Sequence, residues 1–73
     1  MNADELRRIA YQRPFRPFIV RLRNGEVIEI KRSLRTTVWT DRVFLGVNED
    51  PESGIAKRMR IVALTDIESA EHA

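Results

Sequence analysis

The sequence predicts a mainly β (α+β) domain, in which an N-terminal helix precedes a small barrel of about five to six antiparallel strands. Its 73 residues suffice for one domain, which we place at residues 1–73. After the first dozen residues, short segments alternate apolar and polar residues and are separated by turn-forming residues. Short strands at close spacing are typical of small barrels. We therefore expect a helix at about 3–11 and the barrel at about 17–70.

The first residues carry the signals of a capped helix. Asn2 is suited to accept a hydrogen bond from a free amide of the first turn, and Glu5 stands three residues later, at the spacing of a capping box. Pro14 ends the helical pattern, because proline has no amide hydrogen and clashes with the preceding turn. An apolar stripe at helical spacing follows the cap, formed by Leu6, Ile9 and Ala10.

The repeated segment RPFRPF, residues 13–18, links the helix to the first strand. Residues that precede proline favour extended backbone, so we expect a polyproline-like connector. With three residues per turn, Phe15 and Phe18 lie on one side and anchor the connector on the core, while Arg13 and Arg16 lie in water. The segment also contains P-x-x-P, the spacing that SH3-type pockets bind, which leaves a ligand function open.

The dipeptide Asn24-Gly25 predicts a β-hairpin. A two-residue turn would pair Leu22 with Val27, and that register would put charged residues on the apolar face. A three-residue connection at 24–26, with a bulge, pairs Leu22 with Ile28 instead. We predict this bulged register, because it creates one apolar face from Phe18, Val20, Leu22, Ile28 and Ile30.

The segments TTVWT and VFLGV predict a second hairpin, joined by a two-residue turn at Asp41-Arg42. Its outer face carries Trp39 beside Phe44. A polar loop at 48–54 follows, and AKRMRIVAL and DIESA supply two more strands, with LTD as a tight turn between them. The inner face of this hairpin is formed by Val38, Val43, Leu45 and Val47.

With these elements in place, the chain resembles a group of short uncharacterised bacterial proteins with the same layout. The shared features are the short helix, the string P-F-x-P-F-x-V-x-L-x-N-G from Pro14 to Gly25, and the closing IVALTDIESAE. This resemblance covers nearly the whole chain and implies no activity. The layout is also similar to that of Sm-like and other SH3-like barrels, which often bind RNA or peptides. Two departures argue against an RNA-binding ring: VIEIKR lacks the glycine that bends the second strand, and the closing strand lacks a glycine-asparagine pair.

Composition narrows the function classes. The chain has no cysteine and no apolar run of the roughly 18 residues that span a membrane, so we expect a cytoplasmic protein without a membrane partner. The one histidine, His72, is too isolated to form a catalytic triad. The acidic residues Glu49, Asp50 and Glu52 lack the full ligand set of a calcium loop. We therefore expect no enzyme activity, no metal and no cofactor.

Charge is unevenly distributed along the chain. The net charge is +2, but residues 1–36 carry nine basic and four acidic residues, whereas residues 37–73 carry four and seven. We expect a non-enzymatic binding module that contacts single-stranded nucleic acid through a basic and aromatic outer face. The alternative is a protein-interaction or self-assembly domain, a homo-oligomer included, that uses Trp39 and Phe44; neither surface exists if the N-terminal helix covers these two rings. The predicted nucleic-acid contacts are Arg21, Arg23, Lys31, Trp39, Phe44, Arg58 and Arg60.

Overall fold

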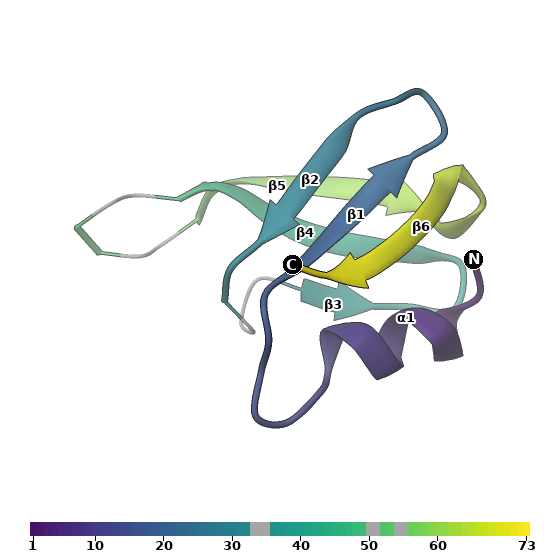
Figure 1. Ribbon diagram of the computed structural model, residues 1–73. Coiled ribbons are helices and arrows are strands. Elements are labelled where there is room, and N and C mark those ends of the chain that lie inside the picture. Colours follow the sequence, from purple (N-terminus) through teal and green to yellow (C-terminus); the bar gives the residue numbers. More distant parts are fainter. Residues whose placement is uncertain (33–35, 50–51, 54–55) are drawn as a thin grey trace.

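Two three-stranded antiparallel sheets and one helix form the structure, a computed structural model that describes residues 1–32, 36–49, 52–53 and 56–73 (Figure 1). The elements are α1 (Ala3–Ala10), β1 (Phe18–Leu22), β2 (Val27–Ile30), β3 (Thr36–Val38), β4 (Arg42–Glu49), β5 (Ala56–Ala63), the 3-10 turn η2 (Leu64–Asp66) and β6 (Ile67–His72). One sheet has the order β2-β1-β6 and the other β3-β4-β5. The mainly β composition and the strand number agree with the prediction. Within the described ranges, no strand pairing joins the two sheets into a closed barrel.

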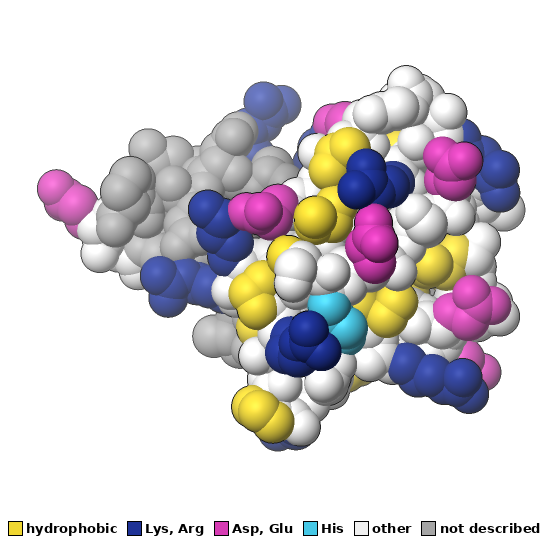
Figure 2. Space-filling view, viewed as in Figure 1, with side chains coloured by type: hydrophobic (Ala, Val, Ile, Leu, Met, Phe, Trp, Pro, Cys, Tyr) yellow, Lys and Arg dark blue, Asp and Glu magenta, His cyan; other side chains and the backbone are white. Residues whose placement is uncertain are grey.

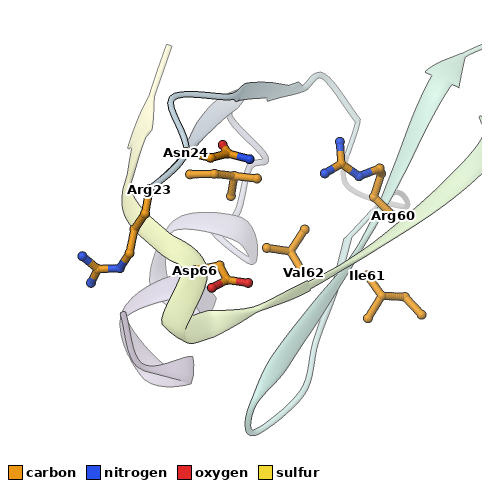
Figure 3. A pocket seen from close by; sticks show the side chains of 7 residues that line it. Arg23, Asn24, Arg60, Ile61, Val62 and Asp66 are labelled. Atoms are coloured by element: carbon orange, nitrogen blue, oxygen red, sulfur yellow. The ribbon is translucent and has the colours of Figure 1, made fainter.

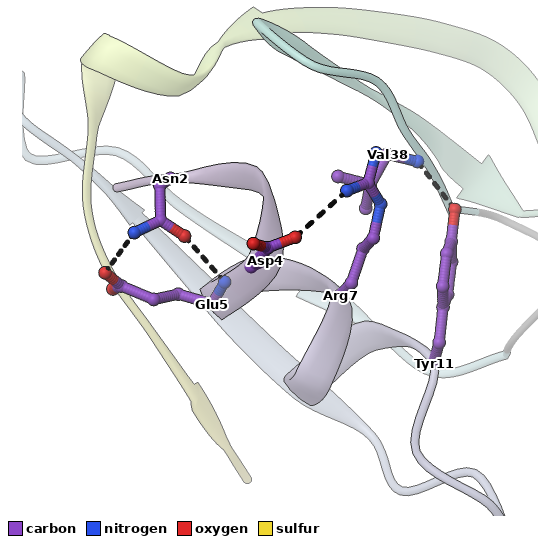
Figure 4. A network of polar contacts seen from close by, with 6 residues as sticks. All are labelled: Asn2, Asp4, Glu5, Arg7, Tyr11 and Val38. Atoms are coloured by element: carbon purple, nitrogen blue, oxygen red, sulfur yellow. Dashed lines mark hydrogen bonds and ion pairs between the residues drawn. The ribbon is translucent and has the colours of Figure 1, made fainter.

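Helix α1 begins at the predicted cap (Figure 4). The Glu5 amide donates to Asn2 Oδ1 at 2.8 Å. The Glu5 carboxylate accepts from Asn2 Nδ2 at 2.7 Å, so the return bond of the capping box goes to the Asn2 side chain. An ion pair between Arg7 and Asp4 at 3.3 Å, one turn apart, lies on the exposed side. The buried side of the helix carries Leu6 and Ala10, with Ile9 partly buried.

The connector after α1 is anchored by its two phenylalanines, as predicted. Phe18 is fully buried and Phe15 packs against the core from a partly buried position. Their rings meet edge to face, with centroids 6.2 Å apart. Arg13 and Arg16 are exposed, and the chain bends at Arg13 and Pro14, which a cis peptide bond joins. The connector therefore holds both rings on one side without being a regular polyproline helix.

The first hairpin has the predicted apolar face but a different register. Val20 lies opposite Ile28 rather than opposite Ile30, and all five residues predicted for the inner face are buried. The connection does contain three residues, but they are 23–25 rather than 24–26. The Gly25 amide donates to Leu22 O at 3.0 Å, and the Leu22 amide donates to Glu26 O at 2.8 Å. Gly25 has a φ of 92°, a conformation that glycine adopts without steric cost and that completes this three-residue turn.

The second hairpin also turns one residue earlier than predicted. Val38 lies opposite Val43, and the Trp39 amide donates to Arg42 O at 2.8 Å. The two-residue turn is therefore Thr40-Asp41 rather than Asp41-Arg42. Val38, Val43 and Leu45 are buried as predicted, whereas the side chain of residue 47 lies outside the described part.

Strand β6 returns to the beginning of the sheet and pairs with β1 antiparallel, with Val20 opposite Ala70. The predicted tight turn before it is the 3-10 turn η2. Hydrogen bonds fix η2 to both hairpins: the Arg23 amide donates to Asp66 O, and the Leu64 amide donates to Asp41 O, each at 2.9 Å. The turn therefore connects the two sheets as well as two consecutive strands.

The core lies between the two sheets and includes the helix. Leu6 of the helix is fully buried, in one cluster with Phe18, Ile30, Leu45 and Ile67. Helix α1 packs against β3 and β6 (Figure 1). The helix is therefore part of the core rather than a cover on an outer surface. Burial of one such side chain contributes roughly 1.5–3 kcal/mol to the stability of the fold.

Candidate functional site

The outer side of the sheet β3-β4-β5 carries a group of apolar side chains. Pairing between strands places Phe44 beside Ile61 and Gly46 beside Met59. Trp39 follows β3, and the centroid of its ring lies 5.1 Å from that of the Phe44 ring, in an edge-to-face arrangement. The exposed fractions are 53% for Trp39, 60% for Met59 and 60% for Ile61, while Phe44 is half-buried. We call these four residues, Trp39, Phe44, Met59 and Ile61, the outer apolar face.

Helix α1 does not cover this face. Its apolar residues Leu6 and Ala10 are buried in the core on the other side of the sheet. At the end of the helix, Tyr11 contacts β3 through a hydrogen bond: its hydroxyl accepts from the Val38 amide at 2.7 Å (Figure 4). This bond fixes the helix end at β3 and leaves Trp39 more than half exposed.

The predicted basic contacts lie in different parts of the molecule. Arg21 is on the outer side of β1, Lys31 follows β2, and Arg23 is in the first hairpin turn. Arg58 and Arg60 alternate along β5 with Ile61 and Met59, so they lie on the opposite side of this sheet from the outer apolar face. The expected basic and aromatic residues therefore do not form one continuous surface, and nucleic-acid binding by this set stays a prediction.

Most of these basic groups have a partner. Arg21 Nε lies 3.0 Å from Glu71 Oε1, and Lys31 Nζ lies 3.5 Å from Glu29 Oε1. Figure 2 shows this side of the molecule, on which basic and acidic side chains lie close together around apolar ones. The two terminal nitrogens of Arg60, Nη1 and Nη2, contact the two carboxylate oxygens of Glu26, and Arg23 Nε donates to Thr65 O at 2.8 Å. Arg58 is exposed and forms no recorded ion pair with another described residue.

Neighbouring arginines lower the pKa of two carboxyl groups, those of Glu26 and Asp41. Hydrogen bonds from Arg60, aided by its charge and opposed by desolvation, lower the pKa of Glu26. The same contact raises the pKa of Arg60. Arg42 lowers the pKa of Asp41 in the same way, through hydrogen bonds at 3.0 and 3.1 Å. Both carboxyl groups therefore remain ionised at neutral pH and neutralise the arginines next to them.

An open cleft of about 520 Å³ separates the first hairpin from β5 (Figure 3). Residues 22–24 line one wall, residues 60–62 line the other, and Asp66 of η2 lies at the base. Figure 3 shows Arg60 and Val62 pointing towards the hairpin and Ile61 pointing away from it. We call this feature the hairpin cleft.

The described residues contain no group of three or more His, Cys, Asp or Glu side chains that could hold a metal ion. Part of the acidic run 49–52 lies outside the described residues. His72 belongs to β6, opposite Phe18, and its Nδ1 is buried without a hydrogen-bond partner. As for the membrane, no described helix is long and apolar enough to span one.

The sequence analysis missed Met59, Ile61 and the partner of Arg60. The first two carried a usable signal, because in RMRIV they alternate with residues on the side of the buried Val62. Contact between Glu26 and Arg60 joins residues 34 positions apart and has no local signal.

Comparisons with family models, curated proteins and solved structures find no match for this chain. Its surfaces are therefore the basis for a functional proposal.

Proposed function

We propose that this chain is a non-enzymatic self-association module, in which two copies pack their outer apolar faces together. The observation that supports it is the grouping of Trp39, Met59 and Ile61, each more than half exposed, around Phe44 on one side of one sheet. Single exposed apolar residues are ordinary on protein surfaces, whereas contiguous ones mark interaction sites.

A second copy suits this face because, among its described residues, the charged side chain is compensated by its neighbour. Arg42 is the charged residue at the described outer positions of β4, and it pairs with Asp41 at 3.0 Å. In a two-fold dimer each face meets its own copy, so a surface with one sign of charge would repel itself. The Asp41–Arg42 pair brings both signs to the rim and avoids this repulsion.

The dimensions also suit a dimer. A standard interface buries about 800 Å² on each partner, which is roughly a sixth of the 4995 Å² accessible surface of this chain. The Cα atoms extend over 33 × 27 × 21 Å, so an interface of that size would occupy most of one broad side. Two sheets that pack face to face would lie about 10 Å apart and interleave their side chains.

We also propose that the two sheets follow the path of a small SH3-like barrel and that the protein works in the cytoplasm. The turn η2 directly before the last strand, and the pairing of that strand with β1, support the fold assignment. The absence of cysteine is consistent with a reducing compartment.

Sedimentation velocity over a wide range of protein concentrations tests the dimer. We expect the wild-type chain to sediment increasingly as a dimer, and Ile61→Lys to remain monomeric because it would bury two unpaired charges. Val27→Lys is the matched control, since Val27 is 52% exposed but lies on the other sheet. A wild-type chain that stays monomeric throughout, or equal disruption by Val27→Lys, would contradict the proposal.

Binding of single-stranded nucleic acid is the second proposal. The exposed Trp39–Phe44 pair supports it, because bases stack on such rings. The ion pairs of Arg21, Lys31 and Arg60 weaken it. In titrations of a labelled oligonucleotide, affinity should fall with salt with a slope of about −0.7 per phosphate neutralised, and Trp39→Ala should weaken binding at unchanged slope. An absence of binding in low salt would eliminate this proposal.

A further inference from the structure

We propose that the hairpin cleft is a β-augmentation site, which binds one extended acidic peptide segment as a fourth strand on β5. This site is separate from the outer apolar face: the cleft is bordered by the backbone of residue 61, whereas the Ile61 side chain points away from it (Figure 3). The inference therefore does not depend on the dimer.

The lining residues show that the cleft lies along β5. Arg60, Ile61 and Val62 are consecutive, and all three border the cleft. Side chains of consecutive strand residues point to opposite faces of a sheet. The side chains of Arg60 and Val62 and the backbone of residue 61 therefore border the cleft, which extends along β5.

One edge of β5 is free to pair. Strand β5 is the last strand of the sheet β3-β4-β5, and in the described residues β4 is its strand neighbour. An edge strand presents unpaired N–H and C=O groups, which an incoming extended chain can satisfy. Peptides that add to sheet edges obtain affinity from these main-chain bonds and specificity from alternate side chains.

The wall opposite β5 leaves room for one added strand but not for a whole sheet. Residues 22–24, at the end of β1 and in the hairpin turn, form the wall opposite β5, and Arg23 is held to η2 by its bonds to Thr65 O and Asp66 O. A strand that already belongs to a folded sheet brings neighbours that this wall would block. The volume of about 520 Å³ lies within the range of about 300–1,000 Å³ typical of ligand sites.

Side chains on this side of β5 determine the peptide chemistry. Leu22 and Val62 are both 5% exposed and give the two walls of the cleft an apolar part. Arg60 and Arg58 follow at two-residue steps on the side of Val62. Glu26 already places a carboxylate on Arg60 from across the cleft, so the geometry for a carboxylate at that position exists within the chain. The matching segment has one small apolar residue followed by acidic residues at the second and fourth positions after it.

NMR titration of ¹⁵N-labelled protein with the peptide acetyl-Val-Thr-Glu-Thr-Glu-amide tests this site. We expect saturable shifts of the amides of residues 60–62 and Asn24. N-methylation of the peptide amides that face β5 should weaken binding about two- to tenfold for each hydrogen bond lost. Acetyl-Val-Thr-Lys-Thr-Lys-amide, which has the same length and spacing, should bind more weakly than the acidic peptide.

Two protein variants sharpen the test. Glu26→Gln removes the competing carboxylate and should tighten the acidic peptide about two- to fivefold, while Arg60→Gln should abolish the preference for glutamate over lysine. Thermal melting first checks that each variant is folded. Unchanged binding after N-methylation, equal binding of the two peptides, shifts centred on Trp39, or no binding to either wild type or Glu26→Gln would overturn the proposal.

Discussion

The outer sides of the two sheets obey the same alternation but carry different chemistry. On β2-β1-β6 the outer positions hold the Arg21–Glu71 ion pair, Glu29 with its partner Lys31, and the exposed Val27. On β3-β4-β5 they hold the outer apolar face. The inner sides of both sheets contribute the buried apolar core, although Arg58 and Arg60 also lie on the inner side of β5. Packing therefore determines the apolar inner positions of both sheets, and the outer positions distinguish a mainly charged surface from a mainly apolar one.

The largest effect should come from placing a charge on the inner side of β2 instead of on its outer side. Ile28→Asp would place an unpaired charge beside Val20 in the core and should unfold this small domain. Val27→Asp, at the exposed neighbouring position, should leave the domain folded. Circular dichroism during urea unfolding measures both. Equal destabilisation would show that β2 does not separate an inner from an outer side as described.

The two anchoring rings should differ from each other. Phe18→Ala should cost about 3–5 kcal/mol, because the ring is fully buried. Phe15→Ala should cost less, since Phe15 is only partly buried where it meets Phe18. Urea midpoints of the two variants give the comparison, with the exposed Arg16→Ala as a control that should be nearly silent. A larger loss for Phe15→Ala would reverse the assignment of the main anchor.

The ion pairs on the outer side of β2-β1-β6 should contribute little to stability. A double-mutant cycle with Arg21→Ala and Glu71→Ala should give a coupling free energy of about 0.2–1 kcal/mol, because both side chains are about half exposed. Added salt should reduce this coupling. Coupling that exceeds this range and resists salt would mean that the pair is shielded from solvent. The outer side of β2-β1-β6 would then be less exposed to water than described.

The smallest effect should be a pH dependence from Glu26. Arg60 lowers the Glu26 pKa below the 4.5 of the free side chain, so this contact stabilises the fold fully above about pH 4.5 and loses its effect as the pH falls through the lower, folded value. The difference in melting temperature between wild type and Glu26→Gln should therefore shrink as the pH falls below 4.5. A difference that stays constant would assign the stabilisation to a cause other than ionisation.

Alternation in the sequence predicted the faces of the strands but not their pairing. Val20 and Ile28 were correctly placed inside, because side-chain direction depends only on counting by two. Their partners depend on which residue adopts the left-handed conformation in the turn, and the hydrogen bonds around Gly25 start the turn one residue earlier. Both hairpins show this same one-residue shift of the turn.

The candidate site was less predictable, because it depends on contacts between distant segments. Trp39 and Phe44 were paired correctly from the hairpin alone. Arg58 and Arg60 were grouped with them, although counting back from the buried Val62 places both on the other side of β5. The position of α1 was also open, and the burial of Leu6 in the core decided it. No local pattern encodes where a helix packs on two sheets.

The pairing of β1 with β6 affects how the chain can fold as it is synthesised. Arg21 and Glu71 are 50 residues apart in the sequence. A ribosome adds about 5–20 residues per second, so β1 and β2 leave the exit tunnel seconds before the strand that completes their sheet. During this interval the apolar side of the hairpin is open to chaperones and to other nascent chains. Non-local closure of this kind also slows folding, so the apolar side of the hairpin stays open for longer than the short length of the chain suggests.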